Sequence, residues 1–152
     1  MEIQITKRAG RNILTCKRAD GTFTSEALGP DFPNHDIAHF VVETHFKLEG
    51  GFYGKIKSGM SIQELSDKEV IRRLGAEAWL SEVLSRNLQV LGAGGCSISE
   101  YIELVNWEAG IMQNIRIPEI SAEEVEKMKT HFDELCKRWD ELKEDEKLVL
   151  EF

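Results

Sequence analysis

The sequence predicts an α+β fold in which a small antiparallel sheet packs with about four helices. Three observations support this prediction. The first 28 residues contain three short segments that alternate like strands, and the last six residues, 147–152, are strand-like again. The segment between them carries repeated helix-start signals. A chain of 152 residues suits one hydrophobic core, so a single domain is expected over residues 1–152.

The predicted sheet begins at the N-terminus, with strands at about residues 2–7, 12–17 and 22–28. In the first strand, Ile3 and Ile5 point to one face, because side chains alternate along a strand. Asp20-Gly21 is typical of a tight hairpin turn. A lone C-terminal strand needs a partner, and only the N-terminal sheet offers one. The two ends of the chain are therefore expected to meet in the sheet.

The middle of the chain is predicted to be helical, with helices at about residues 34–48, 67–91, 98–112 and 121–144. Ser-x-x-Glu capping boxes mark helix starts at Ser66, Ser97 and Ser121, and Ser61 with Glu64 forms a weaker one. The first helix should end at Gly50-Gly51, and residues 50–54 are expected to form a turn or a mobile lid.

Composition and charge disfavour several classes of partner. The formal net charge is −8, whereas phosphate binding favours a basic surface, so no nucleic acid is expected. No apolar run approaches the roughly 20 residues that span a bilayer, and no signal peptide is recognised. The three cysteines form no Cys-x-x-Cys pair and are expected to be reduced thiols in a cytoplasmic protein. The three tryptophans are expected in the core or at a homodimer contact.

The most informative motif lies in the first predicted helix. On that helix His35, Asp36, His39 and Glu43 fall at about 0°, 100°, 40° and 80°, so all four polar groups share one face. Imidazole nitrogens and carboxylate oxygens on one face are typical ligands of a divalent metal, and zinc is the leading candidate. His35, His39 and Glu43 are the predicted ligands, and Asp36 and Glu43 the candidate catalytic carboxylates.

A second ligand set remains open. A span of eight residues along a straight helix is long for one ion, so an acid from another helix is an alternative to Glu43. Glu77, Glu82 and Glu103 lie on predicted helices that could face the site. In that case Glu43 or Asp36 would orient the ligands instead.

The motif also resembles known families. His35-Asp36-x-x-His39 resembles the His-Glu-x-x-His helix of zinc peptidases, with aspartate in the general-base position. It is also similar to a zinc-binding family of ubiquinone biosynthesis, whose distal glutamate is replaced here by Gly51. A closer resemblance, over most of the chain, is to small uncharacterised bacterial proteins that share Phe32-Pro33-x-His35-Asp36-Ile37-x-His39-Phe40-x-Val42-Glu43, Gly51-Phe52-Tyr53-Gly54 and the ending at Trp139 and Leu150-Glu151-Phe152. That resemblance implies a shared fold and no established activity.

Two functional hypotheses follow. The first is a metal-binding protein that acts as a metal-dependent hydrolase on a small-molecule substrate. The second is a non-enzymatic interaction module, in which the histidine face is structural and the acidic C-terminal helix meets a basic partner.

Overall fold

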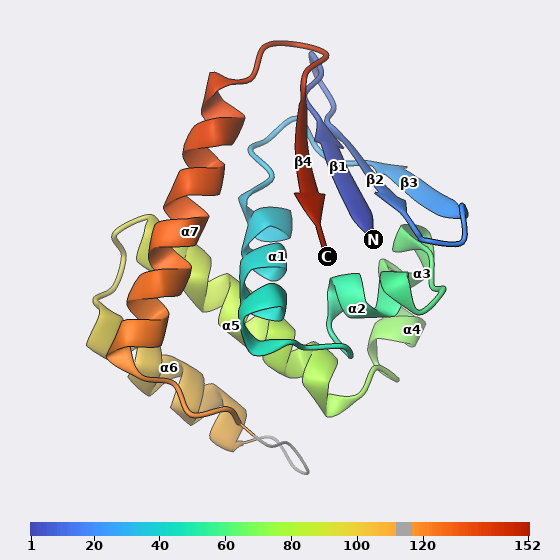
Figure 1. Ribbon diagram of the computed structural model, residues 1–152. Helices are drawn as coiled ribbons and strands as arrows, with labels where there is room; N and C mark the ends of the chain where they lie inside the picture. Colours follow the sequence, from blue (N-terminus) through green and yellow to red (C-terminus); the bar gives the residue numbers. More distant parts are fainter. Residues whose placement is uncertain (112–116) are drawn as a thin grey trace.

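The protein is described by a computed structural model that covers residues 1–111 and 117–152, and its fold is α+β as predicted. The strands are β1 (Glu2–Thr6), β2 (Ile13–Lys17), β3 (Phe23–Ala27) and β4 (Lys147–Glu151). The helices within the described residues are α1 (Asn34–Phe46), α2 (Phe52–Lys57), α3 (Ile62–Leu65), α4 (Lys68–Ile71), α5 (Ala76–Gly92), α6 (Ile98–Gly110) and α7 (Ala122–Glu141). Figure 1 shows α1 at the centre of the molecule, with the sheet on one side and α5 and α7 on the other.

The four strands form one antiparallel sheet in the order β3-β2-β1-β4. Its register aligns the apolar side chains: Ile3 lies between Cys16 and Leu150, and Ile5 between Leu14 and Leu148. All six of these side chains are buried, so this face of the sheet packs against the hydrophobic core.

The two ends of the chain meet, as predicted. The amino group of Met1 donates to the carbonyl oxygen of Phe152, and the Phe152 amide donates back to the Met1 carbonyl at 2.9 Å. The predicted hairpin between β2 and β3 is also present, with Gly21 at φ 86°, a left-handed conformation that glycine adopts without strain.

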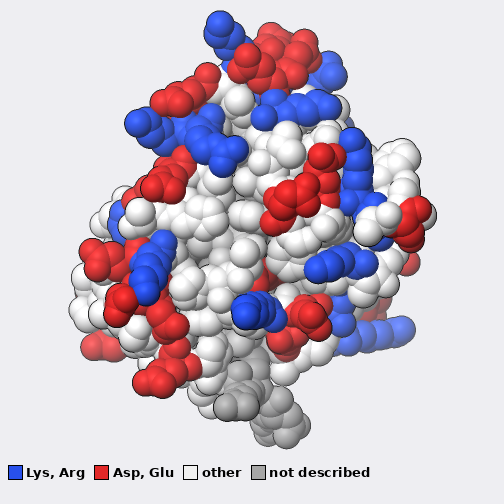
Figure 2. Space-filling view, viewed as in Figure 1, with Lys and Arg blue, Asp and Glu red and all other residues white. Residues whose placement is uncertain are grey.

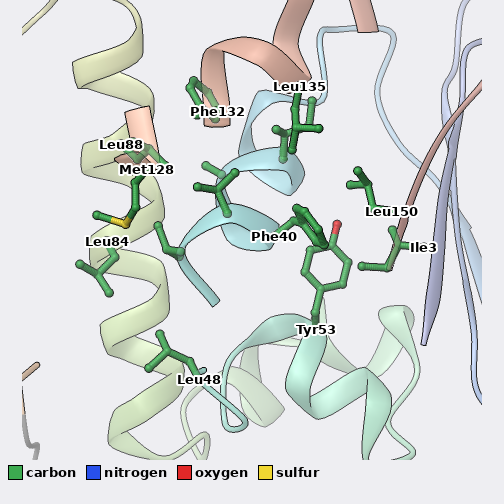
Figure 3. Close-up of a cluster of buried hydrophobic side chains, with 14 of the residues drawn as sticks. Ile3, Phe40, Leu48, Tyr53, Leu84, Leu88, Met128, Phe132, Leu135 and Leu150 are labelled. Carbon is green, nitrogen blue, oxygen red and sulfur yellow. The ribbon is translucent and has the colours of Figure 1, made fainter. Parts of the chain in front are cut away.

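Helix α1 is buried on nearly all sides. Ile37 to Glu43 are seven consecutive buried residues, because α1 packs against α5, α7 and α2. Figure 3 shows Phe40 of α1 directed towards Tyr53 of α2 and towards Ile3 and Leu150 of the sheet, while Leu84, Leu88 and Met128 lie on the α5 side. His39 and Glu43 of α1 therefore lie inside the protein, whereas His35, near the start of the helix, is exposed.

The region after α1 differs from the prediction in two ways. Residues 52–57 form the short helix α2, where a turn or lid was expected. The predicted helix over 67–91 is broken into α4 and α5 at residues 72–75, and Gly75 is the N-cap of α5. Ser66 ends α3 instead of capping a helix, and Asp67 caps α4 by accepting from the amides of Glu69 and Val70.

Helices α6 and α7 follow the predicted pattern more closely. Both begin at Ser-x-x-Glu capping boxes, at Ser97 and Ser121, and the same box starts α3 at Ser61. The predicted end of the third helix, at residue 112, lies outside the described residues. Trp139 is buried as predicted, but Trp107 is 67% exposed and Trp79 is 45% exposed, so neither belongs to the core.

The surface carries mixed charge. Figure 2 shows acidic and basic side chains interspersed over the face drawn. On the acidic helix α7, Lys127 pairs with Glu123 and Lys129 with Asp133, each one turn apart, so part of the negative charge is neutralised locally. None of the helices that the structure describes combines the length and hydropathy that crossing a bilayer requires.

Candidate metal centre

Helix α1 places His35, His39 and Glu43 in one line, with one helical turn between neighbours. The side chain of His39 is 7% exposed and that of Glu43 is fully buried, whereas the His35 side chain is 47% exposed. The two imidazole rings meet edge to face, with centroids 4.6 Å apart. The line of polar groups therefore runs from the solvent side of the molecule into its interior.

Three potential ligand atoms converge at the outer end of this line. Nε2 of His39 lies 3.2 Å from Nε2 of His35 and 3.3 Å from Oε2 of Glu82. The His35 Nε2 lies 3.6 Å from the same Glu82 oxygen, so the three residues form a candidate metal-binding group. A tetrahedral zinc ion with ligands at about 2.0–2.2 Å separates neighbouring ligand atoms by about 3.3–3.6 Å. The triangle thus matches the face of a zinc tetrahedron.

The acid in this group comes from α5, which packs against α1. Of the three acids considered from the sequence, Glu82 reaches the histidines. Glu77 instead accepts a hydrogen bond from the Gly50 amide, and Glu103 is exposed on α6. Glu82, Ser85 and Gln89 recur at helical spacing on α5, and this polar stripe is the signal that would have favoured Glu82 over the other two acids.

Glu43 lies on the far side of the His39 ring from this triangle. Its Oε1 is 3.0 Å from Nδ1 of His39 and accepts from the Ser81 hydroxyl at 2.7 Å and from the Phe52 amide at 2.7 Å. Its Oε2 accepts from the amides of Tyr53, at 2.9 Å, and Gly54, at 3.2 Å. Both oxygens are occupied, so the structure places Glu43 where it orients His39 rather than in the three-residue group.

These contacts also explain α2. A helix begins with amides that lack partners within the helix, and those of α2 donate to the buried Glu43 carboxylate. Gly51 permits the approach, because a Cβ at this position would overlap the Glu43 carboxylate. Residue spacing along the chain does not reveal this capping interaction, which is why a turn was predicted here.

The proton on His39 is defined by its neighbours. Carboxylate oxygens only accept hydrogen bonds, so Nδ1 carries a hydrogen directed at Glu43, and Nε2 faces the triangle. Burial disfavours the charged ring, but the hydrogen bonds with Glu43 and Glu82 outweigh it and raise the pKa of His39 to about 9. The adjacent rings of His35 and His39 hold the pKa of Glu82 well below its usual range. A metal ion would replace the proton on Nε2.

His35 is oriented by Gln89, whose side-chain nitrogen lies 2.8 Å from Nδ1 of His35. An amide can present either a donor or an acceptor, so Gln89 can pair with both neutral tautomers of the ring. Each histidine in the triangle is therefore held at Nδ1 and directs Nε2 towards the shared point, the arrangement usual for metal-ligating histidines.

Asp36 lies beside the histidines but outside the triangle. Asp36 lines the same pocket, and no other residue within the described part of the chain hydrogen bonds to its carboxylate. Burial raises the pKa of Asp36, although the nearby rings of His35 and His39 act in the opposite direction. Asp36 thus adds a partly buried carboxylate to the pocket, beside the two histidines.

The triangle opens into a pocket of about 640 Å³, a size typical of small-molecule sites. One wall is apolar and comes mainly from the segment that includes α3 and α4, with Ile62, Leu65, Ile71 and Leu74. Phe52 forms the wall nearest the metal centre, with its ring 5.5 Å from the ring of His39. The pocket thus combines the polar groups of the triangle with a largely apolar wall.

Comparison of the chain with protein-family models, with curated proteins and with solved structures found no match.

Proposed function

We propose that the protein is a zinc-dependent hydrolase, with His35, His39 and Glu82 as the zinc ligands. The observation that carries the proposal is the size of the triangle formed by their ligand atoms, with edges of 3.2, 3.3 and 3.6 Å. Two nitrogens and one carboxylate oxygen form a ligand set common at catalytic zinc sites, and a set of three protein ligands leaves the fourth position for a water or substrate atom.

The residues around the triangle support this assignment. Glu43 and Gln89 hold the two imidazoles by Nδ1, and the Glu43–His39 pair is the carboxylate–histidine arrangement that raises ligand basicity. When bound, zinc polarises a carbonyl group and makes a water molecule more acidic.

Asp36 is proposed as the general base. In hydrolysis of an ester or amide, a water oxygen bonds to the carbonyl carbon and the bond to the leaving group breaks. Asp36 would accept a proton from that water and pass it to the leaving group. Its place in the pocket wall beside both histidines supports this role.

Metal binding can be tested on protein purified without a histidine tag. We expect about one zinc ion per chain by elemental analysis, and a loss of zinc affinity of tenfold or more in H39A and E82Q, because each removes a ligand. H45A and E103Q are matched controls, since His45 lies on the same helix outside the triangle and Glu103 is exposed. Absence of stoichiometric zinc, or equal affinity in all four variants, would contradict the proposal.

Catalysis is tested separately. Zinc-loaded protein should hydrolyse activated acyl esters or anilides, and D36N should retain zinc while losing most of its turnover, about 100-fold for a general base. Zinc binding without any hydrolysis would contradict the hydrolase and leave only a metal-binding protein. Unchanged turnover in D36N would contradict the assignment of Asp36 as the general base.

A further inference from the structure

The same pocket contains a cation that the metal centre does not use. Lys55 lines the pocket, and among the described residues no carboxylate pairs with its ammonium group. The other pocket cation, Arg86, is already paired with Glu108 of α6. The Lys55 ammonium group can therefore pair with an anion that a ligand brings into the pocket.

The position of Lys55 relates it to the metal centre. Gly51, Phe52 and Lys55 all line the pocket, so they mark one face of α2. Phe52 lies against His39, and Lys55 follows it by three residues, which places its backbone about 5 Å farther along the helix axis. One ligand could therefore contact Lys55 and reach the metal centre at the same time.

The apolar walls determine the rest of the ligand. Ile62, Leu65, Ile71, Leu74 and Trp79 offer contacts to a hydrocarbon or aromatic group and no charged partner.

We infer that the pocket binds organic carboxylates with an apolar body, the carboxylate pairing with Lys55 and the body packing against α3, α4 and Trp79. The inference rests on the proposed function for its biological meaning, because it names the substrate class of that hydrolase. Lys55 is thus a specificity-determining residue that acts on binding and not on the chemical step.

The test compares octanoate with 1-octanol by isothermal titration calorimetry, on zinc-loaded and on metal-free protein. We expect octanoate to bind about tenfold more tightly than octanol to the wild type, and K55M to lose that preference while binding octanol normally. K55R should restore much of the preference. K57M is the matched control, because Lys57 lies on the same helix, is exposed and does not line the pocket.

The outcomes separate this inference from the metal proposal. A carboxylate preference that depends on Lys55 in protein that binds no zinc would support the inference and reject the metal centre. Zinc binding together with equal affinity for octanoate and octanol would support the metal centre and reject the carboxylate site at Lys55. A preference that K55M leaves intact but metal removal abolishes would assign the carboxylate to the ion and overturn the role of Lys55. A thermal melt of K55M like that of the wild type verifies that the variant is folded.

Discussion

Nδ1 of His39 and Oε1 of Glu43 lie 3.0 Å apart, and this contact joins the candidate metal centre to the first turn of α2. The same carboxylate accepts three α2 amides, so the position of His39 depends on a helix that follows it in sequence. Helix α2 also carries the pocket residues Phe52 and Lys55, so one buried carboxylate helps to position both His39 and this wall of the pocket.

Replacement of Glu43 by glutamine should lower the free energy of unfolding by about 3 kcal/mol, because the amide nitrogen would face groups that are themselves donors. Urea denaturation of the metal-free protein measures the change. E49Q is the control, since Glu49 is exposed in the neighbouring loop, and it should change stability by less than about 0.5 kcal/mol. Equal stability of E43Q and E49Q would show that the buried carboxylate does not support α2.

Substitution G51A should also destabilise the fold, by about 1–3 kcal/mol, because the added methyl group would overlap the Glu43 carboxylate. Gly110 provides a comparison: it is the last residue of α6, and a Cβ there meets no atom of the described residues within 4 Å. G110A should be neutral or slightly stabilising. Thermal and urea unfolding of the two variants measure the difference, and a neutral G51A would contradict the close packing at α2.

Zinc affinity should rise with pH. In the metal-free protein the pKa of His39 is raised to about 9, so below that value zinc must displace a proton from the ring. Between about pH 7 and about pH 9 the apparent affinity should increase about tenfold per unit, and then level off. Competition titrations with a chelator measure the slope, and calorimetry in buffers of different ionisation enthalpy measures the proton released. An affinity independent of pH over this range would exclude His39 as a ligand.

Gln89 should influence zinc binding without contacting the ion. Q89A removes the hydrogen bond to Nδ1 of His35 and frees a partly exposed ring, so zinc affinity should fall about tenfold. Q63A, at an exposed position on α3, should have no effect. The fold of Q89A should be preserved, which its circular dichroism spectrum can show. An unchanged zinc affinity in Q89A would mean that His35 does not need the hydrogen bond from Gln89.

Local sequence patterns were sufficient for the strands and for most helix starts. The alternation of Ile3 and Ile5, and the capping boxes at Ser97 and Ser121, are short-range features whose outcome depends little on the rest of the fold. The break at residues 72–75 was missed because the helical pattern continues across it, whereas Ile71 and Leu74 turn towards the pocket.

The site was predicted less completely for a related reason. Helical spacing aligned His35 and His39, but the third residue of the group depends on how α5 packs against α1, which no spacing within either helix reveals. The same is true of Glu43. Its position on the histidine line was predictable, whereas its hydrogen bonds with α2 and Ser81 arise only in the folded protein.

Glu43 contacts both His39 and the first turn of α2, and this has a consequence for the interpretation of mutational scans of this protein. Positions 43 and 51 should be intolerant even in a selection that scores only cellular abundance, because the fold itself depends on their contact. Positions 35, 55 and 82 are partly open to solvent and should tolerate substitution in such a selection. Constraint at these three positions would emerge only in a selection for function, so the two kinds of scan together would distinguish the scaffold from the chemistry it supports.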